Sequence, residues 1–396
     1  MNDSSRFHSL DAVRAFALLA GIALHSTLSF LPGMREGNWP ISDDSSSLSL
    51  AVLFFIVHIF RMSLFYAIAG FFAHVLLERL GAAGLIKNRA HRIALPFVVA
   101  MVVVMPLLFL PFKWAQSQLG MHGMPTIKPP IPDPHLPPWG HLWFLYMLMV
   151  LYALWMAGRA GVLLLDRRGA FMKSVDRIFG AAIASRLAPV IFAAPTALLL
   201  YFTPWWQMWT GIPAPVMGFI PNFPAVLAFG SAFALGWFLH RQAGPLDSLK
   251  RDWLPNISIA LVLSIVATWI IGASPKFYGY ELPPAERIAY AISYNLAAWF
   301  WMFGLIGAAL RFLSNPNAKW RYLADASFYM YIMHLPIVYA LQTWMIRWPL
   351  HWSMKYALVL AITMSLLLVS YHYLVRGTFV GKFLNGRKYP GTPAAG

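Results

Sequence analysis

Long apolar runs alternate along this chain with short segments that are polar or basic. Most runs approach 20 residues, the length at which an α-helix crosses the hydrocarbon core of a membrane. The pattern therefore predicts an all-α, polytopic integral membrane bundle of about ten transmembrane helices. The predicted spans are 11–32, 48–78, 93–112, 139–158, 188–203, 216–239, 254–273, 287–310, 322–346 and 354–375, of which 188–203 is the shortest.

The composition excludes an ordinary soluble protein. Hydrophobic residues make up 59% of the chain and charged residues only 11%, whereas soluble domains carry about 25% charged residues. Cysteine is absent. Disulfides, thiol nucleophiles and thiolate metal sites are therefore excluded, and any covalent chemistry must use another side chain.

Basic residues predict the orientation of the spans. If the N-terminus is cytoplasmic, 21 of the 30 Lys and Arg residues lie on the cytoplasmic side, seven on the opposite side and two within spans. The positive-inside rule thus favours both termini in the cytoplasm. The net charge of +16 then reflects topology. Because no basic face carries interleaved stacking aromatics, we expect no nucleic-acid partner.

The chain divides into a membrane-embedded domain, residues 1–375, and a basic, Gly-rich cytoplasmic tail, residues 376–396, which we expect to be disordered. The first span carries Asp11 and Arg14 and lacks a small-x-small cleavage site, so we expect it to be retained and not removed as a signal peptide. Seven prolines within 113–138 favour an extended outer excursion, which is either a lid or a stiff connector.

Arg14 and His25 are eleven residues apart within the first span. Eleven helical steps return to within about 20° of the start and rise about 16 Å. One stripe of one helix therefore carries a cation near its inner end and an imidazole near its outer end. Ionisable groups inside a membrane usually mark function, and imidazole suits general-base work near neutral pH. The alternative is a histidine that only forms hydrogen bonds between helices.

Other histidines fall at a similar depth. Counting from the ends of their spans, His58, Arg61 and His334 lie between the midplane and the outer half of the bilayer, as His25 does, and His141 lies at the outer interface. Each histidine taken singly is more often a satisfied polar residue than a catalyst. Their overlapping depths in four spans indicate a shared site, if those spans are neighbours.

Basic residues also cluster before the third span, at Lys87, Arg89 and Arg92. Arg89 and Arg92 are three apart, so on a helix they share a face and could bind phosphate groups through forked, charge-assisted hydrogen bonds. Ordinary cytoplasmic loops carry similar charges, and this alternative stays open.

Motifs of soluble enzymes are missing. The chain has no Walker loop, no dinucleotide fingerprint and no HExxH zinc motif, and we expect no metal site and no cofactor. Within the predicted spans, carboxylates occur only near the ends, at Asp11, Glu78 and Asp325. A proton-coupled pump usually keeps an acidic residue in mid-membrane, so this scarcity argues against transport.

Five segments carry a resemblance to a known family. They are 10–16 with the following His25, 58–62, 89–93, 141–145 and 326–334. The chain resembles the membrane-bound acyltransferase-3 family over nearly its whole length, and these five segments carry the resemblance. The His-x-x-Arg-Met and His-Leu-Trp-Phe-Leu segments resemble the branch that succinylates osmoregulated periplasmic glucans. The chain departs from the pattern at Ala69, where many relatives have Ser, and at Leu335, where some have a second His.

The resemblance implies a multi-pass enzyme of the bacterial inner membrane that takes an acyl group from acyl-CoA, here succinyl-CoA, on the cytoplasmic side. The acceptor would be a hydroxyl of a periplasmic glucan. At the matching positions, His25 would take the hydroxyl proton and Arg14 would stabilise the donor or orient the acyl group. Arg89 and Arg92, with Lys87 beside them, would hold the phosphates of CoA. Besides the lipid bilayer and these substrates, no cofactor is implied.

On the acceptor side we expect His58, His141, Trp143 and His334 to contact substrate. Arg61 carries the sharpest hypothesis. A membrane-embedded guanidinium needs a counter-charge, and no acidic residue lies near its estimated depth. We therefore expect Arg61 to bind the distal carboxylate of the succinyl group, unless it only braces helices through backbone carbonyls.

Three rival functions remain at the level of sequence. The nearest is an O-acetyltransferase that uses acetyl-CoA and another envelope polysaccharide or lipid. A second is a glycan transporter, which repeated hydropathy in the two halves would favour. A third is a haem protein that uses paired membrane histidines. The sequence does not fix the oligomeric state.

Overall fold

The computed structural model describes residues 3–34, 39, 41–119, 138–203, 209, 211–241, 245–276 and 282–386. In these ranges the chain is helical, with one isolated β-bridge between Pro138 and Met217. The all-α prediction is confirmed. The helices are α1 (Asp3–His25), η1 (Leu28–Phe30), α2 (Leu48–Arg89), η2 (Ala90–Ala94), α3 (Leu95–Leu119), η3 (Gly140–Leu142), α4 (Trp143–Leu165), α5 (Ala170–Ala184), α6 (Ala188–Tyr201), α7 (Phe223–His240), α8 (Pro245–Arg251), α9 (Trp253–Ile271), α10 (Pro284–Phe312), α11 (Ala318–Met345), α12 (Trp352–Ser370), η4 (Tyr371–Val375) and α13 (Phe379–Asn385).

The helices are consistent with a polytopic membrane protein, but fewer than ten pass on length and apolar character alone. Within the described residues six runs qualify, or seven if the bent pair α5 and α6 is one span. The longest run, Leu48–Gln118, contains two expected spans, 48–78 and 93–112. Gly81, with φ 67°, interrupts the helix between them.

Helices α1 and α11, which correspond to the first and ninth expected spans, are not among these six runs. Polar residues such as Arg14 and His25 in α1, and His334 and Gln342 in α11, lower their apolar character. Both helices pack inside the bundle, where α1 contacts α2, α10 and α11. Their polar residues therefore face protein and cavities, as expected for ionisable groups at membrane depth.

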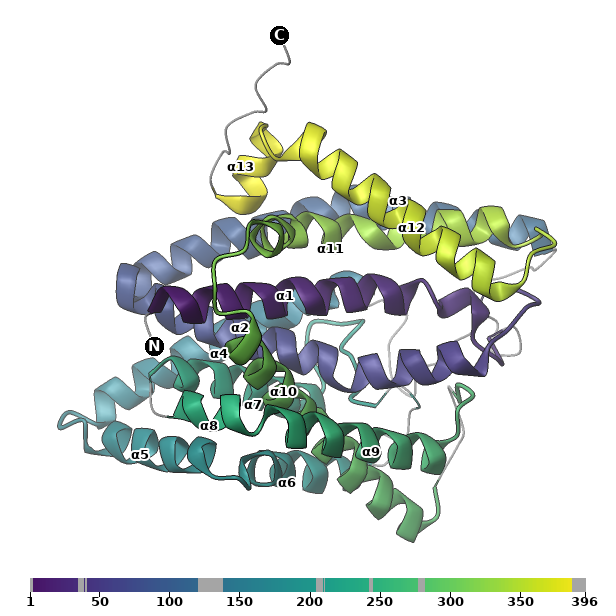
Figure 1. Ribbon diagram of the computed structural model, residues 1–396. Helices are drawn as coiled ribbons and strands as arrows, with labels where there is room; N and C mark the ends of the chain where they lie inside the picture. The colour runs from purple at the N-terminus through teal and green to yellow at the C-terminus, as the bar shows by residue number, and fades with distance from the viewer. Residues whose placement is uncertain are drawn as a thin grey trace.

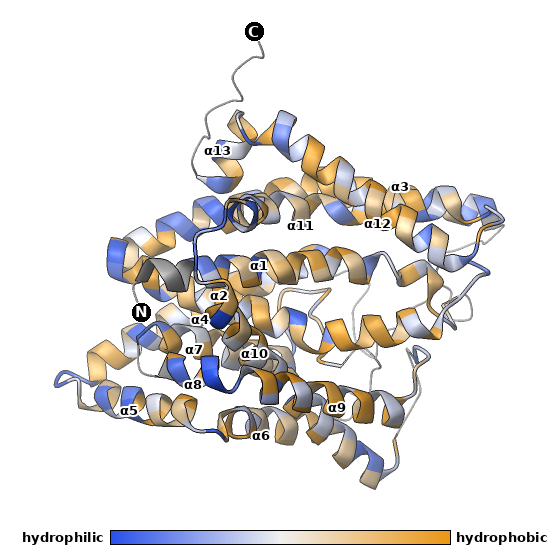
Figure 2. Ribbon diagram, viewed as in Figure 1, coloured by the Kyte–Doolittle hydropathy of each residue, from blue (hydrophilic) through white to orange (hydrophobic). Residues whose placement is uncertain are grey.

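The long helices lie side by side, and the start of α1 lies at the same end of the bundle as α13 (Figure 1). We call inner the end that holds the start of α1 and α13, which the basic residues predict to be cytoplasmic. We call outer the opposite end, where the chain turns from α1 into α2 and from α11 into α12. Figure 2 shows hydrophobic residues along the middles of the helices and hydrophilic residues at both ends, as a bilayer requires.

Helix α2 packs against α7 closely enough for backbone to meet backbone. A Cβ atom added at Gly70 would lie 1.9 Å from the Phe233 carbonyl oxygen, and one at Gly236 would lie 1.7 Å from the Ala67 carbonyl oxygen. Small residues that let helices approach are typical of membrane bundles. This contact fixes α2, which carries His58 and Arg61, against its neighbour.

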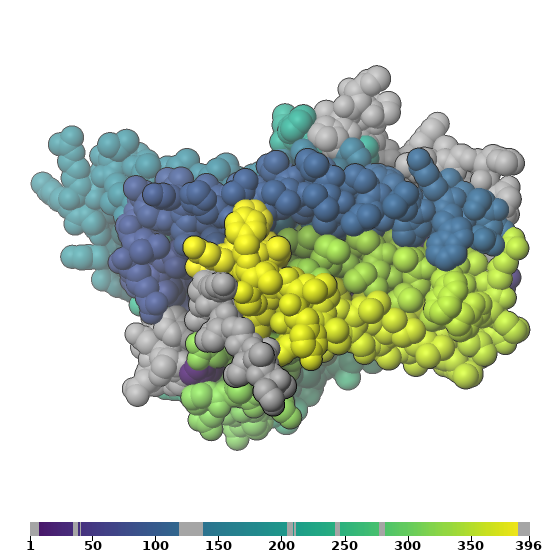
Figure 3. All heavy atoms as spheres, turned by 90° about the horizontal axis from the view of Figure 1, so that it is seen from above, coloured from purple at the N-terminus to yellow at the C-terminus, as the bar shows by residue number. Residues whose placement is uncertain are grey.

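Part of the predicted tail is folded. Residues 376–386 continue from η4 through a turn into α13, which contacts η2 and α11. Figure 3 shows this yellow C-terminal segment beside the blue helix α3. The prediction of disorder is therefore wrong for this part, because Gly381 and Leu384 are buried against the bundle. Residues 387–396, and most of the proline-rich excursion at 120–137, lie outside the described residues.

Candidate active site

The four histidines predicted to lie in the outer half of the bilayer or at its outer interface share a cavity. A cavity of about 460 Å³ near the outer end is lined by His25 from the end of α1, His58 and Arg61 from α2, His141 from η3 and His334 from α11. The helices that carry them are neighbours, since α1 contacts both α2 and α11. The structure thus brings these five side chains together, and their chemical roles stay predictions. Trp143, also predicted to contact substrate, lines the same cavity.

The imidazole rings lie almost in contact. The ring centroids of His25 and His334 are 5.1 Å apart, and those of His141 and His334 are 5.7 Å apart. Two positive imidazolium rings this close would repel each other strongly in a poorly hydrated site. We therefore expect at most one of the rings to be a positively charged imidazolium at a time, which suits a site that passes a single proton.

Backbone carbonyls fix the tautomers of two of these rings. His334 Nδ1 lies 2.7 Å from the Tyr331 carbonyl oxygen, and His141 Nε2 lies 3.1 Å from the Ile332 carbonyl oxygen. A carbonyl oxygen only accepts, so these nitrogens carry the hydrogen and donate it. The opposite nitrogens, His334 Nε2 and His141 Nδ1, are buried and have no hydrogen-bond partner in the described residues. Each is left as a proton acceptor.

His25 is positioned through its backbone. The side-chain amide of Gln342 in α11 donates to the carbonyl oxygens of His25, at 3.3 Å, and Ser26, at 3.0 Å. These carbonyl groups lie at the C-terminal end of α1, where backbone carbonyls lack partners within the helix. His25 Nδ1 has no hydrogen-bond partner in the described chain. The helix end is thus held in place while the imidazole stays available to a ligand.

Arg61 points toward α1, where its Nη1 would lie only 2.2 Å from a Cβ added at Gly21. A glycine at this position therefore makes room for the guanidinium. No ion pair or hydrogen bond of Arg61 is found in the part of the chain that the structure describes, and its Nε is buried without a partner. A lone guanidinium beside a cavity is a ready site for an anion.

Arginines line a second cavity, of about 610 Å³, toward the inner end. Arg14, Arg89 and Arg92 all contribute to its wall, with the acidic residues Asp11 and Asp325. Arg14 donates to the Ala324 carbonyl oxygen at 3.0 Å and lies 3.2 Å from the Asp11 carboxylate. Arg14 and His25 therefore line separate cavities, although they belong to one helix. Lys87, the third predicted donor ligand, is exposed and is not among the residues that line this cavity.

Three aromatic residues separate the two cavities. Phe65, Phe144 and Tyr331 line both. The ring of Phe144 lies 5.5 Å from that of Phe65 and 5.6 Å from that of Tyr331, and we call these three residues the aromatic wall. The Tyr331 hydroxyl donates to the His141 carbonyl oxygen at 2.6 Å, which ties the wall to the histidine cluster. Sequence reasoning gave these residues no role, although Phe144 and Tyr331 lie in segments that carry the family resemblance.

Comparisons with known proteins identify the family of this chain. The acyltransferase domain of the acyltransferase-3 family matches residues 7–372. Glucans biosynthesis protein C of Escherichia coli strain K12 is 31% identical over 157 residues, which make up 38% of this chain and 38% of that protein. The same protein of Escherichia coli O6:K15:H31, strain 536, matches with the same identity and coverage. The aligned part is thus well under half of these relatives.

No solved structure matches the chain. The family match, in contrast, extends over residues 7–372 of the 396. It includes the aromatic wall, all residues that line the outer cavity, and all that line the inner cavity except Leu384 and Asn385. On that evidence, this chain belongs to the acyltransferase-3 family.

Proposed function

We propose that this membrane acyltransferase moves a succinyl group from succinyl-CoA, bound at the inner side, to a hydroxyl of a periplasmic glucan at the outer side. The observation that carries the proposal is the pair of cavities that meet at the aromatic wall, one lined by arginines and the other by histidines. The similarity to glucans biosynthesis protein C supports a glucan as the acceptor.

The inner cavity suits the donor. CoA carries several phosphate charges and is too polar to cross hydrocarbon, so its nucleotide has to stay at the inner side. Arg89, Arg92 and Arg14 supply the cations for those phosphates. The narrow pantetheine arm then carries the thioester past the aromatic wall into the outer cavity.

The outer cavity suits the transfer itself. The acceptor hydroxyl attacks the thioester carbonyl, a C–O bond forms, and His25 takes the hydroxyl proton. The C–S bond then breaks, and the CoA thiolate leaves and receives that proton. His334 Nε2, beside His25, is a second acceptor that can help to align the hydroxyl. Arg61 binds the distal carboxylate of the succinyl group, which an acetyl group lacks.

Mass spectrometry of periplasmic glucans from cells with and without this protein tests the acyl group and the acceptor together. We expect the mass of a succinyl group on the glucans only when the wild-type protein is present, and not with the His25→Ala variant. Glucans that carry acetyl in place of succinyl would favour the O-acetyltransferase alternative. Glucans that are unchanged by an expressed and folded wild-type protein would exclude them as the acceptor.

A further inference from the structure

A second cluster of metal-binding side chains lies toward the inner end of the bundle, away from both cavities described above. His74 and Glu78 are one helical turn apart on α2, and His240 is the last residue of α7. One ligand atom from each residue can be chosen so that all three lie within 4.8 Å of one another. Residues far apart in sequence thus meet here because α2 and α7 pack closely.

The Glu78 carboxylate approaches both imidazoles, with a different oxygen toward each. His74 Nδ1 lies 3.4 Å from Glu78 Oε1, and His240 Nδ1 lies 3.8 Å from Glu78 Oε2. Zinc–nitrogen and zinc–oxygen bonds of about 2.0–2.2 Å in tetrahedral geometry place neighbouring ligand atoms about 3.4 Å apart. The two observed separations are close to this value but involve different oxygens, so Glu78 would bind an ion through both oxygens or turn to offer one of them.

Aromatic neighbours hold both imidazole rings. Trp237 packs edge-on against His74 at 4.8 Å between ring centroids, and Phe71 packs edge-on against His240 at 4.9 Å. The two imidazoles are 5.1 Å apart. Metal ligands bind best when surrounding residues fix their orientation, and packing supplies that here.

The surroundings allow an ion to enter and remain. His74 and Glu78 line a cavity of about 730 Å³, which gives an ion or a water ligand access. Two cations, Arg159 and Arg241, line the same cavity, and Arg241 is paired with Asp176. The Glu78 carboxylate and Asp176 together balance the charges of these two arginines.

We propose that His74, Glu78 and His240 bind a divalent transition-metal ion, with Zn²⁺ as the best match. Two imidazoles and one carboxylate are a common zinc ligand set, with water in the fourth position. The ion would join the inner ends of α2 and α7. It would thereby fix α2, which carries His58 and Arg61 further out, without contacting the substrates.

Zinc analysis of the full-length protein tests this proposal. The protein is purified in detergent without a histidine tag, stripped with EDTA, incubated with Zn²⁺ and analysed by mass spectrometry of the bound metal. We expect one Zn²⁺ per wild-type chain and background levels in the His74→Ala and His240→Ala variants. His372→Ala is the matched control, because His372 is near the inner end but lies outside the cluster, and it should keep one ion.

A ligand exchange distinguishes coordination from folding. Because the chain has no cysteine, His240→Cys would introduce its only thiol, and a thiolate–Co²⁺ charge-transfer band in the near ultraviolet would arise only if that residue binds the metal. We expect this band with Co²⁺ and its loss on adding His74→Ala. A wild-type protein that binds no more Zn²⁺ than His74→Ala, or a folded His240→Cys variant without the band, would overturn the proposal.

Discussion

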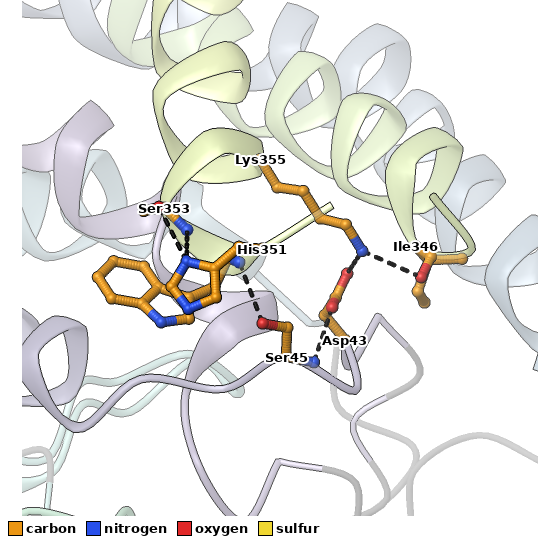
Figure 4. A network of polar contacts seen from close by, with 7 residues as sticks. Asp43, Ser45, Ile346, His351, Ser353 and Lys355 are labelled. Carbon is orange, nitrogen blue, oxygen red and sulfur yellow. Dashed lines mark hydrogen bonds and ion pairs between the residues drawn. The ribbon is translucent and has the colours of Figure 1, made fainter. Parts of the chain in front are cut away.

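Two charged side chains near the outer end of the bundle differ in whether a carboxylate pairs with them. Lys355, at the start of α12, is only 3% exposed, and its Nζ lies 2.6 Å from the equally buried carboxylate of Asp43 (Figure 4). It also lies 3.4 Å from the Ile346 carbonyl oxygen. Arg61 lies beside a cavity, and no carboxylate in the described chain pairs with it.

The difference separates charges that build the fold from charges that are kept for a ligand. The pair of Asp43 and Lys355 ties the segment after α1 to α12, and Ser45 adds a hydrogen bond to the Trp352 backbone. Asp43 also donates its backbone N–H to the Ser29 carbonyl oxygen, so the segment around Asp43 stays close to the end of α1, where His25 lies. An unpaired guanidinium gives the fold no such benefit, so its retention beside a cavity favours a role in binding an anion.

The comparison would fail most clearly if the groups at the outer cavity also supported the fold. We expect His25→Ala to lower the rate of acyl transfer by about 100-fold or more, because a general base typically contributes about 10²- to 10⁴-fold. Expression and the thermal midpoint in detergent should stay close to wild type, since the imidazole has no protein partner for Nδ1. A variant that keeps a tenth of the wild-type rate would remove His25 from this role.

The paired charge should behave in the opposite way. Lys355→Met leaves the Asp43 carboxylate buried without its partner, and loss of one member of a buried pair typically costs about 3–5 kcal/mol of unfolding free energy. We therefore expect a markedly lower thermal midpoint. The double variant Asp43→Asn with Lys355→Met should recover much of the loss, because no charge then remains unpaired. Equal stability of the single variant and wild type would show that the pair does not hold this segment.

Arg61→Met sharpens the comparison at the cavity. A hydrogen bond to a charged group contributes about 1.5–3 kcal/mol, so kcat/KM for succinyl-CoA should fall roughly 10- to 150-fold. The value for acetyl-CoA or propionyl-CoA should change little, because those groups lack the distal carboxylate. Steady-state kinetics with the three donors measure this.

A folded Arg61→Met variant that loses activity equally on all donors would contradict the role in reading the acyl chain. Arg61→Lys is the matched control, since it keeps the charge but lacks the planar fork of arginine. We expect it to fall between wild type and Arg61→Met on succinyl-CoA.

The depth of the site could be predicted from the sequence, but its lateral contacts could not. Helical rise is constant, so counting residues along four spans places His25, His58 and His334 between the midplane and the outer half of the bilayer, with His141 at the outer interface. The structure gives them a common cavity. Which helices lie side by side depends on packing, and this is why the Gly21 contact that makes room for Arg61 was not foreseen.

Pairings between distant segments also could not be predicted from the sequence. Asp43 and Lys355 are 312 residues apart, and nothing near either residue indicates the other. The link between His74 and His240 likewise depends on the close packing of α2 and α7. Helices α1 and α11 are not among the runs that pass on apolar character alone for a related reason: they pack against neighbouring helices and need not be apolar throughout.

The inner arginines carry the smallest expected effect. Arg89 and Arg92 are half-exposed, and solvated ion pairs contribute about 0.2–1 kcal/mol each. Arg89→Ala and Arg92→Ala should therefore each raise KM for acyl-CoA by up to about fivefold and leave KM for glucan unchanged. Lys87→Ala is the control, because this exposed side chain does not line the inner cavity, and KM should stay near wild type. If the arginine variants raised both KM values alike, these residues would support folding and would not bind the donor.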